Sequence, residues 1–181
     1  EPILGLMSAA GYDCMAVGNR EFHFTEHGFQ SKLSQASYAK LCANVRPASG
    51  ASLPVAPSVL LQRCGITVGI FGLTVPMVVP HSRVAAFSAY VFDDPIQCGV
   101  RMAGELRERC DLLIALTHIG LAQDRRLAQE APAIDIIVGG HSHNKLEHGE
   151  VVNGVRIVQT GAHGRFYGVV ELEKNSARWD S

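Results

Sequence analysis

The sequence has 181 residues, a length that suits one domain of ordinary size. Hydrophobic residues make up 47% and charged residues 18%, so the chain can bury a core, and this composition excludes a disordered protein. The 16 Lys and Arg against 17 Asp and Glu give a formal net charge of -1, with no basic run, which excludes a nucleic-acid-binding protein. No apolar stretch approaches the ~18 residues that a membrane span requires.

The cysteines are odd in number, widely spaced and mostly set among apolar neighbours. A disulfide framework uses paired cysteines in a compact pattern, so we expect reduced, buried thiols, which slightly favour a cytoplasmic location. No cysteine stands beside a histidine or in a basic segment, which argues against a cysteine nucleophile. The five are Cys14, Cys42, Cys64, Cys98 and Cys110.

Short apolar runs alternate with amphipathic segments along the whole chain, which predicts alternating strands and helices. A Cys64-Gly65 turn predicts a hairpin, and Asp94 followed by Pro95 predicts a helix start with an Asp cap. The expected helices cover residues 2–10, 26–36, 95–110 and 121–131; the expected strands cover 13–17, 40–45, 58–62, 66–74, 111–116, 134–138, 155–159 and 166–172.

This order of elements predicts an α/β fold whose sheet is covered on both faces. The hairpin and the two closing strands add antiparallel members, so we expect a mixed sheet. We expect residues 1–174 to form one domain and residues 175–181 to form a tail.

Polar residues follow three of the predicted strands. Asn19 comes after the first strand, His118 after the strand over 111–116, and His141 and His143 after a double glycine that ends the strand over 134–138. In α/β sheets ligands bind outside the carboxyl ends of the strands, so these side chains should converge on one site. Imidazole nitrogens and an amide oxygen suit zinc, manganese, iron or a similar metal ion. In an extended loop His141 and His143 would point to opposite sides and could serve two metals.

The other histidines carry weaker signals. His27, His81 and His148 stand in polar surroundings and are expected to face solvent, and His163 is expected in a turn at the rim of the site. The sequence contains no Gly-x-Ser-x-Gly elbow, no P-loop and no Gly-x-Gly-x-x-Gly after a strand, so serine-hydrolase and nucleotide-fold motifs are absent.

Four segments, in order, carry a resemblance to a known family. They are Gly-Tyr-Asp-Cys-Met-Ala-Val-Gly-Asn-Arg-Glu-Phe, Ala-Leu-Thr-His-Ile-Gly with Asp124 after it, Gly-Gly-His-Ser-His, and Ile-Val-Gln-Thr-Gly-Ala-His-Gly. Together they resemble the calcineurin-like metallophosphoesterases, and most of all the branch of 5'-nucleotidases and UDP-sugar hydrolases. The similarity covers nearly the whole chain.

The resemblance implies a four-layered α/β/β/α sandwich with two divalent metal ions at one edge of the sheets. In such enzymes a hydroxide held by the metals attacks phosphorus, and the metals stabilise charge on the phosphoryl oxygens. Carried over position by position, Asn19, His118 and His141 match ligands of one metal, and His143 matches a ligand of the other. The substrate would be a small phosphate ester, such as a nucleotide.

The sequence departs from the family pattern in its catalytic pair. The family's Asn-His-Glu element is Asn19-Arg20-Glu21 here, and His23 stands where an Asp orients the family's His. Arg20 can hold a phosphate oxygen with its guanidinium group but cannot donate a proton near neutral pH, whereas the imidazole of His23 has a pKa suited to proton transfer. The Asp-x-His and Gly-Asp motifs, with the first strands that carry them, have no match in the sequence.

Three hypotheses follow. The first is a metal-dependent phosphoester hydrolase domain; the second is a catalytically degenerate module that binds metal or phosphate, which the residues at 20 and 23 favour. The third is a plain α/β domain with structural histidines. Strand edges left open by absent first strands would favour self-association. Many relatives in the nucleotidase branch are exported, so the resemblance leaves an exported protein open beside a cytoplasmic one.

Overall fold

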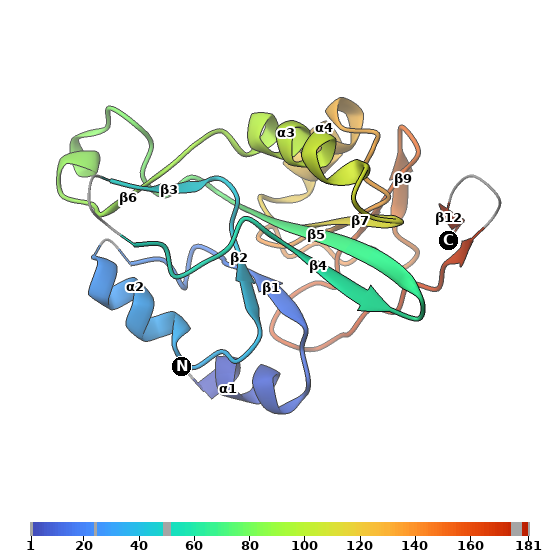
Figure 1. Cartoon of the computed structure of the whole chain (residues 1–181), viewed down its shortest axis with the longest axis horizontal. Helices are drawn as coiled ribbons and strands as arrows, with labels where there is room; N and C mark the ends of the chain where they lie inside the picture. The colour runs from blue at the N-terminus through green and yellow to red at the C-terminus, as the bar shows by residue number, and fades with distance from the viewer. Residues whose placement is uncertain (1, 24, 49–51, 175–178, 181) are drawn as a thin grey trace.

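A six-stranded mixed sheet is the centre of the protein (Figure 1), whose computed structural model describes all residues except 1, 24, 49–51, 175–178 and 181. Four central strands run parallel, and an antiparallel strand lies at each edge. In spatial order the strands are β4 (Ser58–Arg63), β5 (Ile66–Thr74), β7 (Leu112–His118), β8 (Ile136–Val138), β10 (Val155–Val158) and β9 (Glu150–Val152). The predicted hairpin is confirmed, because β4 and β5 pair antiparallel around Cys64 and Gly65.

Alternation of side chains along each strand gives this sheet two apolar faces. Leu113 and Ala115 of β7 point to one face, where they pack with residues of α3 (Pro95–Arg107) and α4 (Leu121–Glu130). Their neighbour Ile114 points to the opposite face. The predicted cap of α3 is confirmed, since the Asp94 carboxylate accepts hydrogen bonds from the first backbone N–H groups of the helix.

The second face packs against two more layers. The parallel pair of β1 (Cys14–Ala16) and β2 (Ala39–Leu41) lies across β5 and β7, and Leu41 is fully buried between the two sheets. Helix α1 (Pro2–Ala9) covers the far side of this pair through Leu4 and Met7. The order of layers is therefore helices, six-stranded sheet, two-stranded sheet and helix, which confirms the expected α/β/β/α sandwich (Figure 1).

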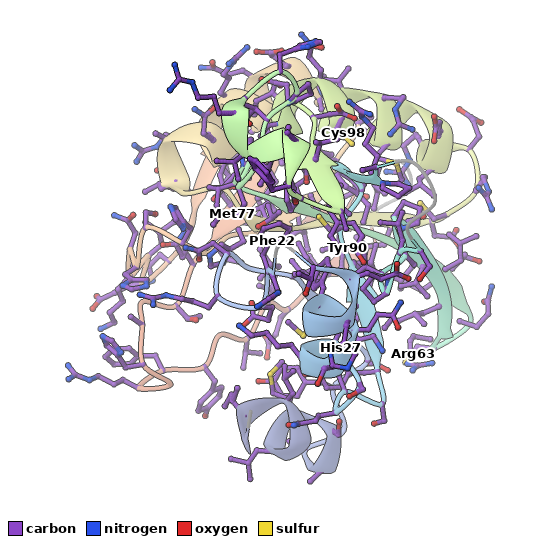
Figure 2. All side chains as sticks on the ribbon, turned by 90° about the vertical axis from the view of Figure 1, so that its left-hand side faces the viewer. Phe22, His27, Arg63, Met77, Tyr90 and Cys98 are labelled. Carbon is purple, nitrogen blue, oxygen red and sulfur yellow. The ribbon has the colours of Figure 1, made fainter. Side chains whose placement is uncertain are left out.

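A cluster of aromatic side chains packs the loop after β1 and helix α2 (Glu26–Leu33) against β6 (Tyr90–Phe92). Phe22 packs edge-on against Phe92, with ring centroids 5.0 Å apart, and Phe29 of α2 packs edge-on against Tyr90 at 5.1 Å. Figure 2 shows Phe22 and Tyr90 in this region. The antiparallel pair of β3 (Val45–Pro47) and β6 carries the cluster, and a short 3₁₀ helix (Arg83–Ala86) precedes it.

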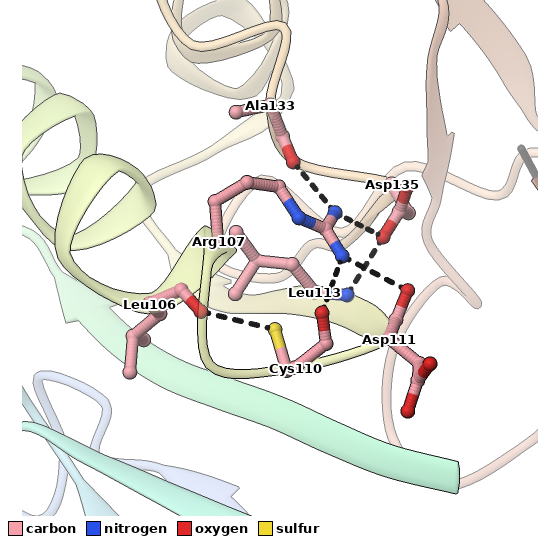
Figure 3. Close-up of polar contacts among 7 residues, drawn as sticks. All are labelled: Leu106, Arg107, Cys110, Asp111, Leu113, Ala133 and Asp135. Carbon is pink, nitrogen blue, oxygen red and sulfur yellow. Dashed lines mark hydrogen bonds and ion pairs between the residues drawn. The ribbon is translucent and has the colours of Figure 1, made fainter. Parts of the chain in front are cut away.

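Arg107 of α3 binds several residues at the amino ends of β7 and β8 (Figure 3). Arg107 Nη1 donates a 2.8 Å hydrogen bond to Asp135 Oδ2, which also accepts from the backbone of Leu113. The same guanidinium group donates to the backbone carbonyl oxygens of Ala133, Cys110 and Asp111. Helix α3 and two strands are thus tied together at one point.

Two expectations about strands need correction. The predicted strand over 166–172 is wrong: β9 already occupies the edge beside β10, and this segment is irregular, with Phe166 and Tyr167 exposed. The strand over 40–45 is divided, because β2 ends at Leu41 and β3 begins at Val45 in a different sheet. Of the expected tail, residues 175–178 and 181 lie outside the described residues, and β12 (Trp179–Asp180) pairs with β11 (Glu173–Lys174).

All five cysteines are free thiols, as expected, although Cys64 is exposed in the hairpin turn rather than buried. Burial raises the pKa of Cys42 to about 12 and that of Cys14 to about 11, so neither is a thiolate near neutral pH. Among the helices that the structure describes, none is both long enough and apolar enough to cross a membrane.

Candidate metal centre

Two imidazoles and one amide oxygen meet at the carboxyl ends of the strands. His118, the last residue of β7, places its Nε2 atom 2.9 Å from Asn19 Oδ1 and 3.3 Å from His141 Nδ1. The rings of His118 and His141 stand edge to face, with centroids 5.0 Å apart. The structure thus brings together three of the four residues that the sequence nominates as metal ligands.

His143 stands beside these residues and contacts a different histidine. Its ring packs edge-on against His163, with centroids 5.8 Å apart, and both side chains are exposed. The expected extended loop is wrong, because His141 and His143 both have left-handed backbones, with φ of 75° and 59°. The two rings nevertheless have different partners, because His141 contacts His118 and His143 contacts His163.

Glycines allow the loop before His141 to lie close to β7. A Cβ atom on Gly139 would lie 2.4 Å from Asp124 Oδ2, and one on Gly140 would lie 3.2 Å from the carbonyl oxygen of Thr117 and 3.3 Å from His118 Nδ1. Any side chain at residue 139 would push the loop away from the helix behind it. The double glycine is therefore needed for His141 to reach His118.

Burial keeps His118 uncharged. The pKa of His118 falls to about 4 because burial disfavours the charged ring, and the nearby rings of His141 and His143 act in the same direction. A neutral imidazole keeps a lone pair for a metal ion, so this histidine does not have to lose a proton before it binds one near neutral pH.

A buried carboxylic acid lies behind the centre. Asp124 of α4 has 0% of its surface exposed, and its Oδ1 atom accepts a 2.6 Å hydrogen bond from Thr117, the residue before His118. Its Oδ2 atom has no hydrogen-bond partner in the described part of the chain and faces Gly139. Burial raises the pKa of Asp124 to about 7, against the opposing hydrogen bond from Thr117.

Curated relatives match almost the whole chain. An uncharacterized metallophosphoesterase of Bacillus subtilis, YunD, is 26% identical over 176 residues, which cover 96% of this chain and 37% of that protein. A 5'-nucleotidase of Vibrio vulnificus is 28% identical over 204 residues, with the same two coverages of 96% and 37%. The chain therefore spans little more than a third of these relatives. No protein-family model matches it.

Solved structures share the fold. The 5'-nucleotidase precursor of Thermus thermophilus superposes with a TM-score of 0.72 and 27% identity, covering 87% of this chain and 34% of that chain. The calcineurin-like phosphoesterase YfkN of Bacillus subtilis superposes with a TM-score of 0.77 and 22% identity, covering 99% of this chain and 64% of that one. The chain has the fold of the calcineurin-like metallophosphoesterases, and its similarity extends to 5'-nucleotidases.

The donor atoms of this metallophosphoesterase domain fit one divalent metal ion. At metal–ligand bonds of about 2.0–2.1 Å, two ligands of one ion lie about 2.9–3.4 Å apart, which matches the distances from His118 Nε2 to Asn19 Oδ1 and to His141 Nδ1. Imidazole nitrogens with an amide oxygen suit a transition metal or zinc. Within the described residues no group of three or more His, Cys, Asp or Glu forms a complete metal site, so further ligands are required.

The two residues nominated for catalysis lie on the loop after β1. Arg20 is exposed beside Asn19, and its carbonyl oxygen accepts a 2.9 Å hydrogen bond from Lys32 Nζ. His23 is exposed at the start of α2, where its Nδ1 atom accepts from the backbone N–H of Thr25 at 3.2 Å. The same Nδ1 atom lies 3.0 Å from the hydroxyl oxygen of Thr25. The structure does not link His23 to Asn19 or His118 by any described hydrogen bond.

Sequence reasoning missed the supports of the centre. Glu21 accepts a 2.9 Å hydrogen bond from the backbone N–H of Gly18 and so closes the loop that carries Asn19. Gln159 follows β10 and is buried, as is Asp124. The alternation along β10 could have revealed Gln159. Residues 155 and 157 are apolar and face the helices, so the side chain of residue 159 points into the same buried space.

Proposed function

We propose that this chain is the metal-binding domain of a phosphoester hydrolase that acts on small phosphate esters, with nucleotides as the first candidates. The convergence of Asn19, His118 and His141 on the strand ends of two different sheets is the observation that carries this proposal. The names of the relatives support it, since they include metallophosphoesterase and 5'-nucleotidase. Because the chain spans 37% of those proteins, the activity of the whole protein is part of the proposal.

The metals of this site would be divalent ions such as zinc, manganese or iron, and two are expected. Asn19, His118 and His141 would hold one ion, and His143 would contribute to the other. When bound, the ions supply a nucleophile from water and neutralise charge on the phosphoryl oxygens. The neutral state of His118 suits this role, because a neutral imidazole has a lone pair on one ring nitrogen that can bind a metal ion.

Arg20 and His23 would act on the substrate from the loop after β1. No hydrogen bond or ion pair of the Arg20 guanidinium group occurs within the described residues, and the group is exposed next to Asn19, so it can receive a phosphate oxygen. His23 contacts Thr25 through Nδ1, so its Nε2 atom is the nitrogen that would give a proton to the leaving group.

The test is hydrolysis of 5'-AMP and of p-nitrophenyl phosphate with Mn²⁺ or Zn²⁺, by the complete product of the reading frame that encodes this chain. His118→Ala and His141→Ala should each lower kcat/KM more than about 100-fold, because loss of a ligand costs more than the ~10–100-fold of an outer-shell change. Arg20→Ala should mainly raise KM, and His23→Ala should mainly lower kcat. His163→Ala should have a milder effect than either ligand variant.

His27→Ala is the matched control, since His27 is an exposed histidine of α2 in no contact with the centre among the described residues. Metal binding without hydrolysis of either ester would contradict the enzyme and favour the degenerate binding module. If His118→Ala and His141→Ala change neither metal binding nor hydrolysis, the histidines are structural and the plain α/β domain is correct.

A further inference from the structure

The side chain of Gln159 forms hydrogen bonds to the loop that carries His141 and His143. Gln159 follows β10, and 2% of its surface is exposed. Its Oε1 atom accepts hydrogen bonds from the backbone N–H of Asn144 and, at 3.3 Å, from the hydroxyl group of Ser142, while its Nε2 atom donates at 3.3 Å to the carbonyl oxygen of Gly140. Every contact falls on a residue that precedes or follows a histidine, and none falls on an imidazole.

The loop needs such a support because its backbone is strained. His141 and His143 are non-glycine residues with φ of 75° and 59°. A left-handed backbone is unfavourable for residues with a Cβ atom, and it persists where the surroundings hold it in place. The loop is also exposed at residues 141 to 144, so few apolar contacts fix it. Backbone hydrogen bonds hold the two ends of the loop, from Gly139 N–H to the carbonyl oxygen of Val158 at 2.8 Å and from Gly161 N–H to that of Asn144 at 2.8 Å. The amide group of Gln159, buried beneath the loop, adds side-chain hydrogen bonds between these two points.

Ser142 links the side chain of Gln159 to the start of α4, the helix that follows His118. The Ser142 hydroxyl group, which donates to Gln159, accepts a 3.0 Å hydrogen bond from the backbone N–H of Leu121. Leu121 begins α4, three residues after His118. The loop of His141 is therefore tied on one side to β10 and on the other to the helix that leaves β7.

We propose that Gln159 is a positioning residue that sets the affinity of the metal centre by holding His141 against His118. This inference rests on the proposed function, because it assigns a purpose to the position of these rings. An amide is required at this place: one end must accept from Ser142 and Asn144, and the other must donate to Gly140. A carboxylate would set an oxygen against the carbonyl oxygen of Gly140, and an apolar side chain would leave buried donors and acceptors unpaired.

The experiment compares Gln159→Met, which keeps the size but no hydrogen bond, with Gln159→Glu, which keeps the acceptor but loses the donor. Zn²⁺ binding to the chain is measured by isothermal titration calorimetry, and the order parameters of backbone amides 140–144 are measured by NMR in the metal-free protein. We expect Zn²⁺ to bind about 10–100-fold more weakly to Gln159→Met than to the wild type. The Zn²⁺ affinity of Gln159→Glu should lie between those of Gln159→Met and the wild type. The order parameters of residues 140–144 should fall in both variants.

Arg107→Met is the control for a general loss of stability, because Arg107 ties the opposite edge of the sheet. It should unfold more easily than the wild type and keep the Zn²⁺ affinity and the order of the loop. Unchanged order parameters in Gln159→Met, or a Zn²⁺ affinity within about twofold of the wild type, would overturn the proposal. Absence of Zn²⁺ binding to the wild type would instead refute the metal centre, and the order parameters would still decide whether Gln159 positions the loop.

Discussion

Thr117 and His118 are consecutive residues of β7 whose side chains serve opposite faces of the sheet. Thr117 donates to the buried Asp124 of α4, whereas His118 contacts Asn19, which follows β1 in the second sheet. The alternation of side chains along β7 thus turns Thr117 toward the buried acid of α4 and turns His118, a candidate metal ligand, toward the space between the sheets. The end of one strand fixes both the site and its support.

Gly139 should tolerate no side chain. In Gly139→Ala the new Cβ atom would lie 2.4 Å from Asp124 Oδ2 and 3.0 Å from Gln159 Nε2, so the loop or the helix must shift. We expect a loss of about 2 kcal/mol or more in the free energy of unfolding, together with weaker metal binding. Gly104→Ala is the matched control, because nothing lies within 4 Å of its Cβ position in α3 and alanine favours a helix. Urea unfolding of both variants checks this; equal stabilities would contradict the packing described here.

The pH dependence of stability should report Asp124. Its folded pKa is raised to about 7, so the native state holds a proton that the unfolded state releases near its ordinary pKa of 3.8. The stabilisation is fully present below about pH 3.8 and is lost as the pH rises through about 7, with about 1.4 kcal/mol for each unit of the shift as an upper bound. Asp124→Asn removes the titration, so its free energy of unfolding should fall less than that of the wild type between pH 4 and pH 8. Parallel curves for the two proteins would show that Asp124 is ionised at neutral pH.

Arg107 should be the most important ionic residue for stability. Arg107→Met removes the guanidinium donor from the carbonyl oxygens of Ala133, Cys110 and Asp111 and leaves Asp135 Oδ2 with the backbone N–H of Leu113, in a region where the Arg107 and Asp135 side chains are only 28% and 20% exposed. We expect a loss of about 2 kcal/mol. Arg101→Met, which removes an exposed ion pair with Glu105 one turn along α3, should cost less than about 0.5 kcal/mol. Thermal unfolding of the two variants distinguishes them, and a similar change in both would show that the Arg107 contacts are not important.

Much of the fold could be predicted from the sequence because local signals agree with the final structure. The Asp94-Pro95 start of α3 and the Cys64-Gly65 turn are local rules that the tertiary structure did not override. The prediction of a strand over 166–172 failed because the tertiary structure overrides the local signal. The apolar residues of this segment suit a strand, but β9 takes the only edge beside β10 within the described sheet.

The candidate site could be predicted only in part. The ends of the predicted strands revealed Asn19, His118 and His141. For the two histidines the reason is that β7 and β8 run parallel, so both strands end at the same edge of the sheet, whereas Asn19 follows β1 in the second sheet. Gln159 could not be found in this way, because its function depends on three bonds to a loop about 15–19 residues away in the sequence. A buried amide after a strand shows its partners only in three dimensions.

Metal content per chain tests the central claim most directly. The chain would be purified without chelators, and its zinc, manganese and iron would be measured by elemental analysis beside the double variant His118→Ala, His141→Ala. The account predicts at least about one metal ion per wild-type chain and nearly none in the double variant, since two of three donors are then gone. About two ions per chain would mean that both positions of the family centre are filled. Equal metal content in the two proteins would contradict the assignment of Asn19, His118 and His141 as a metal centre.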